Sequence, residues 1–270
     1  MSTALAEATN HVATYGSNPW FGSLKPNPGA QVRLFCFPYA GGGAAIYQGW
    51  AEHLPAAIDV CPIHLPGRGV RVNEKAYTKV SDLVRDLTPA ILPLLDKPYA
   101  LFGHSMGGLI SFELARELRR RNVPAPVHIF ISGRKAPQIP QQEEFIYNLP
   151  ESEFVETLLR LNGTPTDILE NKELMCIMIP LLRADFELCE RYLYVNEAPL
   201  ESPITAFGGI QDFDVELSHL QAWSEQTTGS FVRRLLPGNH FFLHSQATLL
   251  LWLLSQALHR IIGDLPRRRC

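Results

Sequence analysis

The sequence predicts an α/β fold in which a mostly parallel central sheet is flanked by helices. Short apolar or β-branched runs, typical of buried strands, occur at 32–37, 58–63, 99–102, 127–132, 204–207 and 231–236. Amphipathic helical patterns lie between them, at 44–53, 78–95, 106–121, 216–224 and 244–262. Strands that alternate with helices are joined by right-handed crossovers, which make the strands parallel. Functional sites in such sheets lie beyond the carboxyl ends of the strands.

Turn-forming or small residues follow most of these strands, which supports each assignment in chain order. The stops after the six runs are, in order, Pro38, His64-Leu65-Pro66-Gly67, Gly103, Gly133, Gly208-Gly209 and Pro237-Gly238. Every motif discussed below falls at one of these strand ends. The sequence therefore predicts one site, assembled at one edge of the sheet.

One segment interrupts the alternation of strands and helices. Between 137 and 199 there is no strand pattern, but helical patterns occur at 151–161 and 171–194. We expect these helices to form a cap, or lid, over the active site; helices packed on the sheet edge are the alternative. The chain is then a single domain over 1–270, with its core at about 20–136 and 200–264 and the lid at about 137–199.

The most informative motif is Gly103-His104-Ser105-Met106-Gly107, between the third strand and a helical pattern. A strand, Gly-x-Ser-x-Gly and a helix in this order form the nucleophile elbow of an α/β-hydrolase. The turn is too tight for side chains beside the serine, whose hydroxyl stands exposed. The sequence therefore predicts the α/β-hydrolase fold with Ser105 as its nucleophile.

A nucleophilic serine needs a base, and the base needs an acid that orients it. His240 follows the sixth strand on a loop, whereas its neighbour His244 lies at the start of the last helix, so His240 is favoured as the base. The acid is expected on the loop after the fifth strand, where Asp212 and Asp214 compete. We favour Asp212, because Asp214 has an alternative role as the cap of a helix that begins near Val215.

Two backbone N–H groups should stabilise the oxyanion that forms during acyl transfer. One is that of Met106, directly after the serine. The other lies on the glycine-rich loop after the first strand, where Ala40 is favoured and Tyr39 is the alternative. This loop lacks the Gly-Lys-Ser/Thr ending of a P-loop and the spacing of a dinucleotide fingerprint, so neither phosphate-binding motif is predicted.

Composition limits the classes of partner. The net charge is −3 and hydrophobic residues make up 46%, which gives no indication of nucleic-acid or membrane binding. The five cysteines lack metal-ligand spacing, so no metal site is expected. The first 18 residues do not resemble a secretory signal, and the run 249–254 is too short to cross a bilayer. We expect a cytoplasmic protein.

Several segments together resemble the stand-alone type II thioesterases that accompany polyketide and non-ribosomal peptide synthases. The resemblance extends from about Trp20 to the last helix. The matching stretches are Arg33-Leu34-Phe35-Cys36-Phe37-Pro38-Tyr39-Ala40-Gly41-Gly42, Leu65-Pro66-Gly67-Arg68-Gly69, Phe102-Gly103-His104-Ser105-Met106-Gly107-Gly108, Leu182-Arg183-Ala184-Asp185-Phe186 with Glu190 and Tyr192, Gly208-Gly209 with Asp212, Trp223, and His240-Phe241-Phe242.

The resemblance implies hydrolysis of acyl or aminoacyl thioesters from the phosphopantetheine arm of a carrier protein, either for editing or for product release. Ser105, Asp212 and His240 match the family's catalytic triad, and Ala40 and Met106 match its oxyanion positions. The stretch 210–213 departs from the paired acids and proline that are common in the family. No cofactor is implied, and the carrier is expected to be a separate, transient partner of a monomer.

Three other functions remain open on the sequence alone: a small-molecule esterase or lipase, an acyltransferase that passes the acyl group to an alcohol or amine, and a non-enzymatic carrier-binding scaffold. The lid is expected to line an apolar acyl pocket with Leu158, Met175, Met178 and Phe186.

Two of the segments that carry the family resemblance are given structural roles in this interpretation. Leu65-Pro66-Gly67-Arg68-Gly69 is expected to be a turn, with Arg68 or Arg71 facing an anionic partner as the alternative. Arg183 and Asp185 are expected to form a local contact that anchors the lid.

Overall fold

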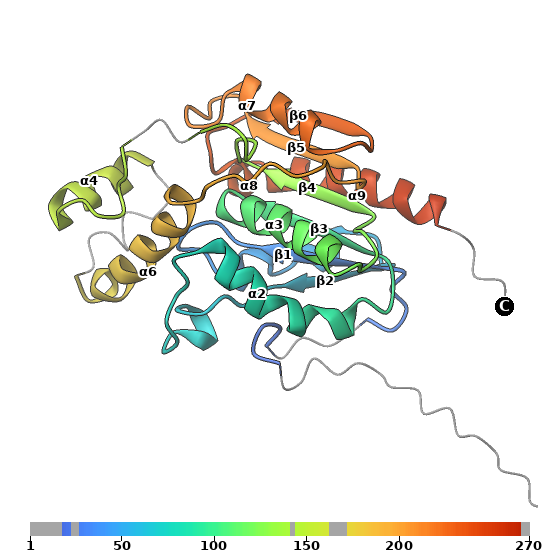
Figure 1. Cartoon of the computed structure of the whole chain (residues 1–270), viewed down its shortest axis with the longest axis horizontal. Coiled ribbons are helices and arrows are strands. Elements are labelled where there is room, and N and C mark those ends of the chain that lie inside the picture. Colours follow the sequence, from blue (N-terminus) through green and yellow to red (C-terminus); the bar gives the residue numbers. More distant parts are fainter. Residues whose placement is uncertain (1–17, 23–26, 141–143, 162–171, 266–270) are drawn as a thin grey trace, which may run out of the picture.

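The structure is a computed structural model that describes residues 18–22, 27–140, 144–161 and 172–265. These residues contain a six-stranded sheet in the order β2-β1-β3-β4-β5-β6, and every neighbouring pair is parallel (Figure 1). The strands are β1 (Val32–Phe37), β2 (Ile58–Pro62), β3 (Tyr99–His104), β4 (His128–Ser132), β5 (Ile204–Gly209) and β6 (Phe231–Leu236). The predicted α/β fold and all six predicted strands are therefore confirmed.

Helices follow the strands as predicted, with some breaks. The elements are η1 (Ala44–Tyr47), α1 (Trp50–His53), η2 (Gly69–Arg71), α2 (Val80–Ile91), η3 (Leu92–Leu94), α3 (Met106–Arg120), α4 (Glu151–Leu161), α6 (Lys172–Glu190), α7 (Leu217–Gln221), η4 (Ala222–Gln226), α8 (Phe242–Ser245) and α9 (Ala247–Asp264). The helix expected over 44–53 is split by Gly49, whose φ of 78° is left-handed. The last helical pattern likewise divides into α8 and α9.

The strand ends differ slightly from the sequence-based expectation. β3 continues through Gly103 and His104, which pair with Ile131 and Ser132 of β4. β5 likewise continues through both glycines, because Gly209 pairs with Leu236. The sheet ladder thus extends to the residues that precede the predicted catalytic loops, and it holds those loops in fixed register.

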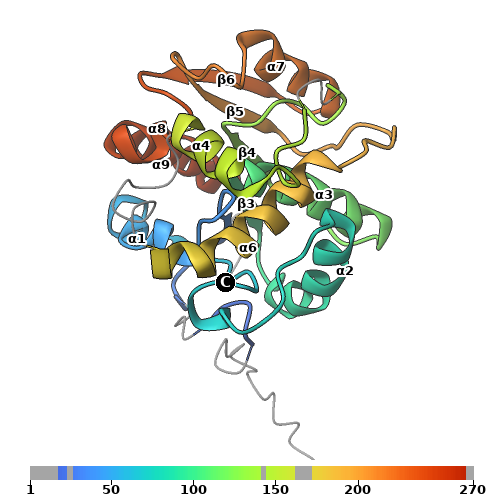
Figure 2. The ribbon, with the colours of Figure 1, turned by 90° about the vertical axis from the view of Figure 1, so that its left-hand side faces the viewer.

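Two apolar layers cover the sheet, one on each face. Alternate residues of β1 point to opposite sides: Phe35 and Phe37 pack with α2 and α3, and Leu34 packs with α1 and α9. Because both faces are buried, the strands are nearly continuous apolar runs, as is usual for parallel sheets. Figures 1 and 2 show α4 and most of α6 beyond one end of the sheet, while the last part of α6 reaches the layer that contains α3, where Leu188 is buried.

A third, smaller apolar cluster joins α4 to α6. Phe154, Leu158, Met175 and Leu182 are its buried members. The helical patterns predicted between 137 and 199 therefore exist, although part of that segment, including 162–171, lies outside the described residues. Among the helices that the structure describes, none combines the length and apolar character needed to cross a membrane.

Candidate active site

Ser105 lies in the turn between β3 and α3 with φ 52° and ψ −113°. A side-chain-bearing residue with positive φ is strained, and such strain concentrates at functional sites. The turn is held by a hydrogen bond from the Ser105 N–H to the Ser132 carbonyl oxygen, 2.7 Å away. This is the geometry expected of a nucleophile elbow, which presents the hydroxyl above the carboxyl edge of the sheet.

The glycines beside Ser105 are required by close backbone contacts. A Cβ at Gly103 would lie 1.9 Å from the carbonyl oxygen of Gly107, and a Cβ at Gly107 would lie 2.0 Å from the carbonyl oxygen of Phe37. Both distances are impossible for real atoms, and in both cases the obstacle is rigid backbone. The motif predicted from the sequence therefore has a steric cause, since strand, turn and helix meet too closely for side chains.

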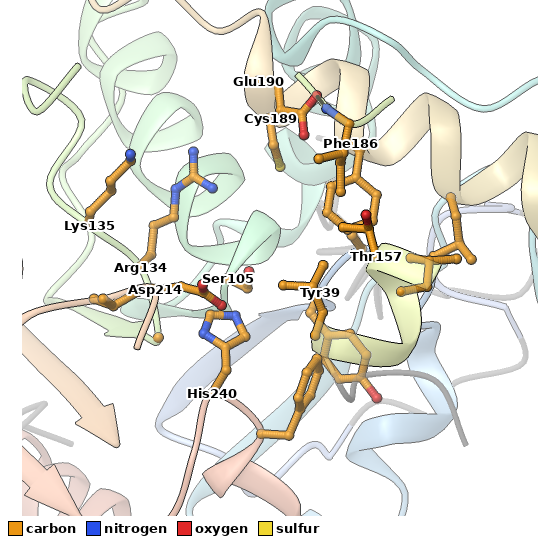
Figure 3. Close-up of a pocket in the computed structure, with 18 of the residues that line it drawn as sticks. Tyr39, Ser105, Arg134, Lys135, Thr157, Phe186, Cys189, Glu190, Asp214 and His240 are labelled. Carbon is orange, nitrogen blue, oxygen red and sulfur yellow. Dashed lines mark hydrogen bonds between the residues drawn. The ribbon is translucent and has the colours of Figure 1, made fainter. Parts of the chain in front are cut away.

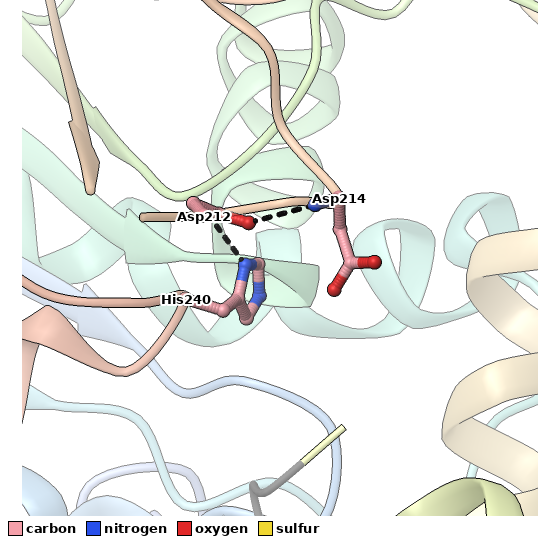
Figure 4. A group of neighbouring side chains, drawn as sticks. All are labelled: Asp212, Asp214 and His240. Atoms are coloured by element: carbon pink, nitrogen blue, oxygen red, sulfur yellow. Dashed lines mark hydrogen bonds and ion pairs between the residues drawn. The ribbon is translucent and has the colours of Figure 1, made fainter. Parts of the chain in front are cut away.

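Asp212 and His240 form a hydrogen-bonded pair at the ends of β5 and β6. His240 Nδ1 lies 2.8 Å from Asp212 Oδ2 (Figure 4). The Asp212 side chain is wholly buried, and its Oδ1 accepts the backbone N–H groups of Asp214 and Val215 at 3.1 and 3.2 Å. An ionised carboxylate only accepts, so the ring donates through Nδ1 and its Nε2 remains a proton acceptor.

One pocket contains both Ser105 and His240, and Figure 3 shows the two side chains facing the same space. Ala40 and Tyr39 of the glycine-rich loop also line it. The structure thus brings Ser105, His240 and the predicted oxyanion loop together, with Asp212 behind the histidine. Met106 is the first residue of α3, where the helix supplies no acceptor for its N–H group.

The expected capping role of Asp214 is wrong. The helix after this loop, α7, begins at Leu217 and is capped by Glu216 and His219. The backbone N–H of Asp214 instead donates to Asp212, while its own carboxylate lines the pocket and is exposed. The preference for Asp212 as the partner of His240 therefore agrees with the geometry, although the reason given for excluding Asp214 does not.

Asp212, Asp214 and His240 bring potential metal-ligating atoms within 4.8 Å of one another. The Asp212 oxygens are already bonded to the imidazole and to two backbone N–H groups. A buried acid that orients a histidine accounts for this cluster without an ion. His244, the competing histidine, is not part of the pocket lining, and its Nε2 lies 2.8 Å from the Tyr39 hydroxyl.

Two of the four predicted acyl-pocket residues line the pocket, namely Leu158 of α4 and Phe186 of α6. Met175 and Met178 are not part of its lining, which corrects that expectation. Met175 is buried in the cluster between α4 and α6, and Met178 packs against the same cluster. Helical periodicity identified the apolar residues of α4 and α6, but which face each one occupies depends on how the two helices pack.

The pocket also contains polar residues that sequence reasoning did not select. Burial raises the pKa of Glu190, whose carboxylate accepts the backbone N–H groups of Ile146 and Tyr147. Burial raises the pKa of the Cys189 thiol to about 11, so this thiol stays protonated and is no competing nucleophile. Arg134 and Lys135, which follow β4, supply positive charge to the same pocket.

His104, within the serine motif, is fully buried beside His240, with 5.3 Å between the ring centroids. Its Nδ1 lies 2.9 Å from the Ser132 hydroxyl. Burial, followed by the neighbouring histidines, lowers the pKa of His104 well below its ordinary value. The ring is therefore neutral and packs behind the site. In the sequence, nothing distinguished His104 from any other residue that Gly-x-Ser-x-Gly allows between its first glycine and the serine.

The predicted contact between Arg183 and Asp185 does not form. Arg183 donates to the carbonyl oxygen of Tyr147 and stacks over the ring of Phe154, whereas Asp185 pairs with Arg68. Arg68 is therefore buried. The alternative interpretation, in which it faces outward toward an anionic partner, is wrong for this residue. Arg71 is also buried, and it pairs with Glu74.

A parallel sheet with a strained serine between strand and helix, and a buried acid–histidine pair on the next two loops, defines the class of α/β-hydrolases. Within that class the family follows from the sequence. The model of the Thioesterase domain family matches residues 32–258. The chain therefore belongs to the thioesterase domain family and is a thioesterase.

Curated relatives and solved structures are similar to most of the chain. The chain is 48% identical over 227 residues to "Gramicidin S biosynthesis protein GrsT" of Aneurinibacillus migulanus, covering 84% of this chain and 89% of that protein. It is also 48% identical over 242 residues to "Linear gramicidin dehydrogenase LgrE" of Brevibacillus parabrevis, covering 88% and 92%. That name denotes a redox activity, whereas the family model that matches this chain denotes a thioesterase.

Among solved structures, a similar one is the RedJ thioesterase from the prodiginine biosynthetic pathway of Streptomyces coelicolor. It has a TM-score of 0.81 and 39% sequence identity, and the match covers 85% of this chain and 91% of that one. The α/β-hydrolase fold predicted from the elbow motif is thereby confirmed.

Proposed function

We propose that this thioesterase hydrolyses acyl or aminoacyl thioesters carried on the phosphopantetheine arm of carrier proteins in polyketide or non-ribosomal peptide biosynthesis. The family and the pathways named for the relatives support the substrate class. The observation that carries the chemistry is the Asp212–His240 hydrogen bond of 2.8 Å at the pocket that holds the strained Ser105.

The first half-reaction forms an acyl-enzyme. Ser105 attacks the thioester carbonyl while His240 Nε2 takes the hydroxyl proton, and Asp212 stabilises the resulting imidazolium. The carbonyl oxygen becomes an oxyanion, which the N–H groups of Ala40 and Met106 bind. The carbon–sulfur bond then breaks, and the pantetheine thiol leaves with the proton from His240.

The second half-reaction hydrolyses the acyl-serine. His240 takes a proton from water, the hydroxide attacks the acyl carbon, and the same oxyanion donors bind the new intermediate. Ser105 then leaves with the proton. These steps use protein groups and water alone, so we propose that the reaction needs neither a metal nor an organic cofactor.

The pocket supports an acyl group that is largely apolar. Leu158, Leu161, Leu182 and Phe186 line it from the lid side. The lining also carries charges of both signs, from Arg134 and Lys135 and from Glu144, Glu190 and Asp214. We propose a transient complex of one thioesterase monomer with a separate carrier, in which the lid and the pocket rim supply the contacts.

The test is release of acyl groups from a loaded carrier protein, followed by mass spectrometry of the carrier. Wild-type enzyme should discharge the carrier and return the free thiol, and Ser105→Ala should not. Release should be faster from the carrier than from oxygen esters of the same acyl group. Turnover of oxygen esters without discharge of the carrier would support an esterase, and acyl transfer to an added amine without free acid would support an acyltransferase.

A further inference from the structure

Asp185 of the lid helix α6 reaches the loop that is expected to bind the oxyanion. Its Oδ2 accepts the backbone N–H of Gly41 at 2.7 Å. Gly41 directly follows Ala40, the proposed oxyanion donor. Asp185 is only 1% exposed, so this contact is shielded from water. An ionised acceptor in such surroundings forms a strong hydrogen bond.

Arg68 holds this carboxylate in place from the loop after β2. Its two terminal nitrogens donate to Asp185, Nη1 to Oδ2 at 2.6 Å and Nη2 to Oδ1 at 2.8 Å. Nη1 also donates to the carbonyl oxygen of Gly42 at 3.1 Å, and Nε donates to that of Pro66 at 3.2 Å. One planar guanidinium therefore joins the lid helix, the glycine-rich loop and its own turn, a geometry that lysine cannot reproduce.

The hydrogen bond from the Gly41 N–H favours one of two conformations, type II over type I, that the turn over residues 39–42 could adopt. The Gly42 N–H donates to the Tyr39 carbonyl oxygen at 2.9 Å, which closes a four-residue turn with Ala40 and Gly41 at its centre. Gly41 has φ 77°, the value of the third residue of a type II turn. A flip of the Ala40–Gly41 peptide towards type I would turn a carbonyl oxygen, in place of the N–H, towards the Asp185 carboxylate.

Packing against α6 supports the same turn. A Cβ at Gly41 would lie 2.6 Å from Leu182 Cδ2 and 3.7 Å from Met178 Cε. Met178, Leu182 and Asp185 follow one another at helical spacing, so a single face of α6 covers the turn. Leu182 also lines the pocket. The lid helix and the oxyanion loop thus share an interface that has both an apolar and a charged part.

We propose that Asp185, held by Arg68, is a positioning residue that fixes the conformation of the turn over residues 39–42. The fixed turn aims the Ala40 N–H, which belongs to the adjoining Tyr39–Ala40 peptide, at the oxyanion. Through this pair, the placement of α6 is coupled to the formation of the oxyanion hole. The proposal rests on the proposed function, because it assigns Ala40 as a donor. Asp185 acts through Gly41 and Ala40, and it takes no part in proton transfer.

Two variants test this role. Asp185→Asn keeps the shape of the side chain but removes the negative charge that holds the Arg68 guanidinium. Arg68→Lys keeps the positive charge but removes the pair of nitrogens that donate to the two carboxylate oxygens. The control is Arg71→Lys in the same turn, because Arg71 is equally buried but donates to Glu74 and to the His64 carbonyl oxygen. With an N-acetylcysteamine thioester, both test variants should lose about 10- to 100-fold in kcat, while KM stays within about twofold.

A second measurement separates positioning from general loosening of the lid. Ser105 labelled with an alkyl phosphonate places a phosphoryl oxygen in the oxyanion site, and its phosphorus NMR shift reports the hydrogen bonds to that oxygen. The shift should move in both test variants and stay in place in Arg71→Lys. Affinity for a trifluoromethyl ketone analogue, which forms an oxyanion, should fall by the same factor as kcat/KM.

Unchanged kcat in folded Asp185→Asn, or reduced kcat with an unmoved phosphorus signal, overturns the proposal. If Asp185→Asn does not fold, as circular dichroism would show, Arg68→Lys alone carries the same comparison. The small thioester needs no carrier protein. A wild-type enzyme that hydrolyses it but leaves loaded carriers intact would therefore refute the proposed substrate while this test still proceeds.

Discussion

The carboxylate of Asp212 and the imidazole of His240 meet because the loops after β5 and β6 are joined by hydrogen bonds. Ile210 donates to the Leu236 carbonyl oxygen and Gln211 to that of Gly238, both at 2.9 Å, and the Gln211 side chain accepts the Gly238 N–H at 2.7 Å. The parallel ladder therefore continues into the loops. It delivers the acid and the base, which are 28 positions apart in sequence, to adjacent places.

Asp212→Asn should reduce kcat by about 10³- to 10⁴-fold with little change in KM. The amide can still accept the N–H groups of Asp214 and Val215, but its NH₂ group would then face Nδ1 and favour the wrong tautomer of His240. The matched control is Asp214→Asn, which should change kcat by less than about threefold because the 2.8 Å hydrogen bond to His240 Nδ1 comes from Asp212. Steady-state kinetics with a small thioester measures kcat for both variants. A larger loss of kcat in Asp214→Asn than in Asp212→Asn would make Asp214 the catalytic acid.

Ser105→Ala and His240→Ala should each remove nearly all thioester hydrolysis, and the double variant should be no slower than the worse single one. The reason is that the two side chains act as one unit, so that removing either disables the other. Rates of carrier discharge for the wild type and the three variants measure this. Additive losses would mean that His240 does not act through Ser105.

Gly103→Ala should lower the free energy of unfolding by about 1–3 kcal/mol, because its Cβ would overlap the backbone of Gly107. The control is Gly263→Ala in α9, where a Cβ would have no contact within 4 Å. That substitution should instead raise the free energy of unfolding by about 0.5–1 kcal/mol, since alanine favours helix. Urea denaturation of both variants compares them, and equal effects would contradict the steric argument.

Acid should destabilise the folded state through His128. Burial lowers the pKa of His128 to about 4, and its Nε2 lies 2.8 Å from the Thr205 hydroxyl. The unfolded chain binds a proton near pH 6.5 and the folded chain does not, so the free energy of unfolding should fall as pH decreases from about 6.5 to 4. The full loss from this group is about 3 kcal/mol.

Urea denaturation at several pH values measures this effect. His128→Gln should make the free energy of unfolding less dependent on pH in that window, while His259→Gln, at an exposed ring of α9, controls for the loss of a histidine. Burial lowers the pKa of His104 as well, so part of the acid dependence should remain in His128→Gln. An unchanged slope would show that His128 is accessible to protons in the folded state.

Local patterns were sufficient for most of the architecture and for the chemical groups of the site. Short apolar or β-branched runs predict the strands because both faces of a parallel sheet are buried. The elbow is recognisable because steric overlap between strand and helix leaves glycine as the residue that fits at Gly103 and Gly107. The obstacle at Gly103 is the nearby Gly107, and the obstacle at Gly107 is Phe37 of β1. Both constraints are visible in the sequence because each one selects glycine at a fixed place in the motif.

Contacts between distant segments needed the folded chain. The pairing of Asp185 with Arg68, 117 positions away, and its bond to Gly41 leave no local pattern. For the same reason sequence spacing placed Asp185 beside Arg183, made Asp214 a helix cap and put Met175 and Met178 in the pocket lining. Residue types and spacing determine which groups the chain offers, whereas the packing of segments that are distant in sequence determines which of them meet.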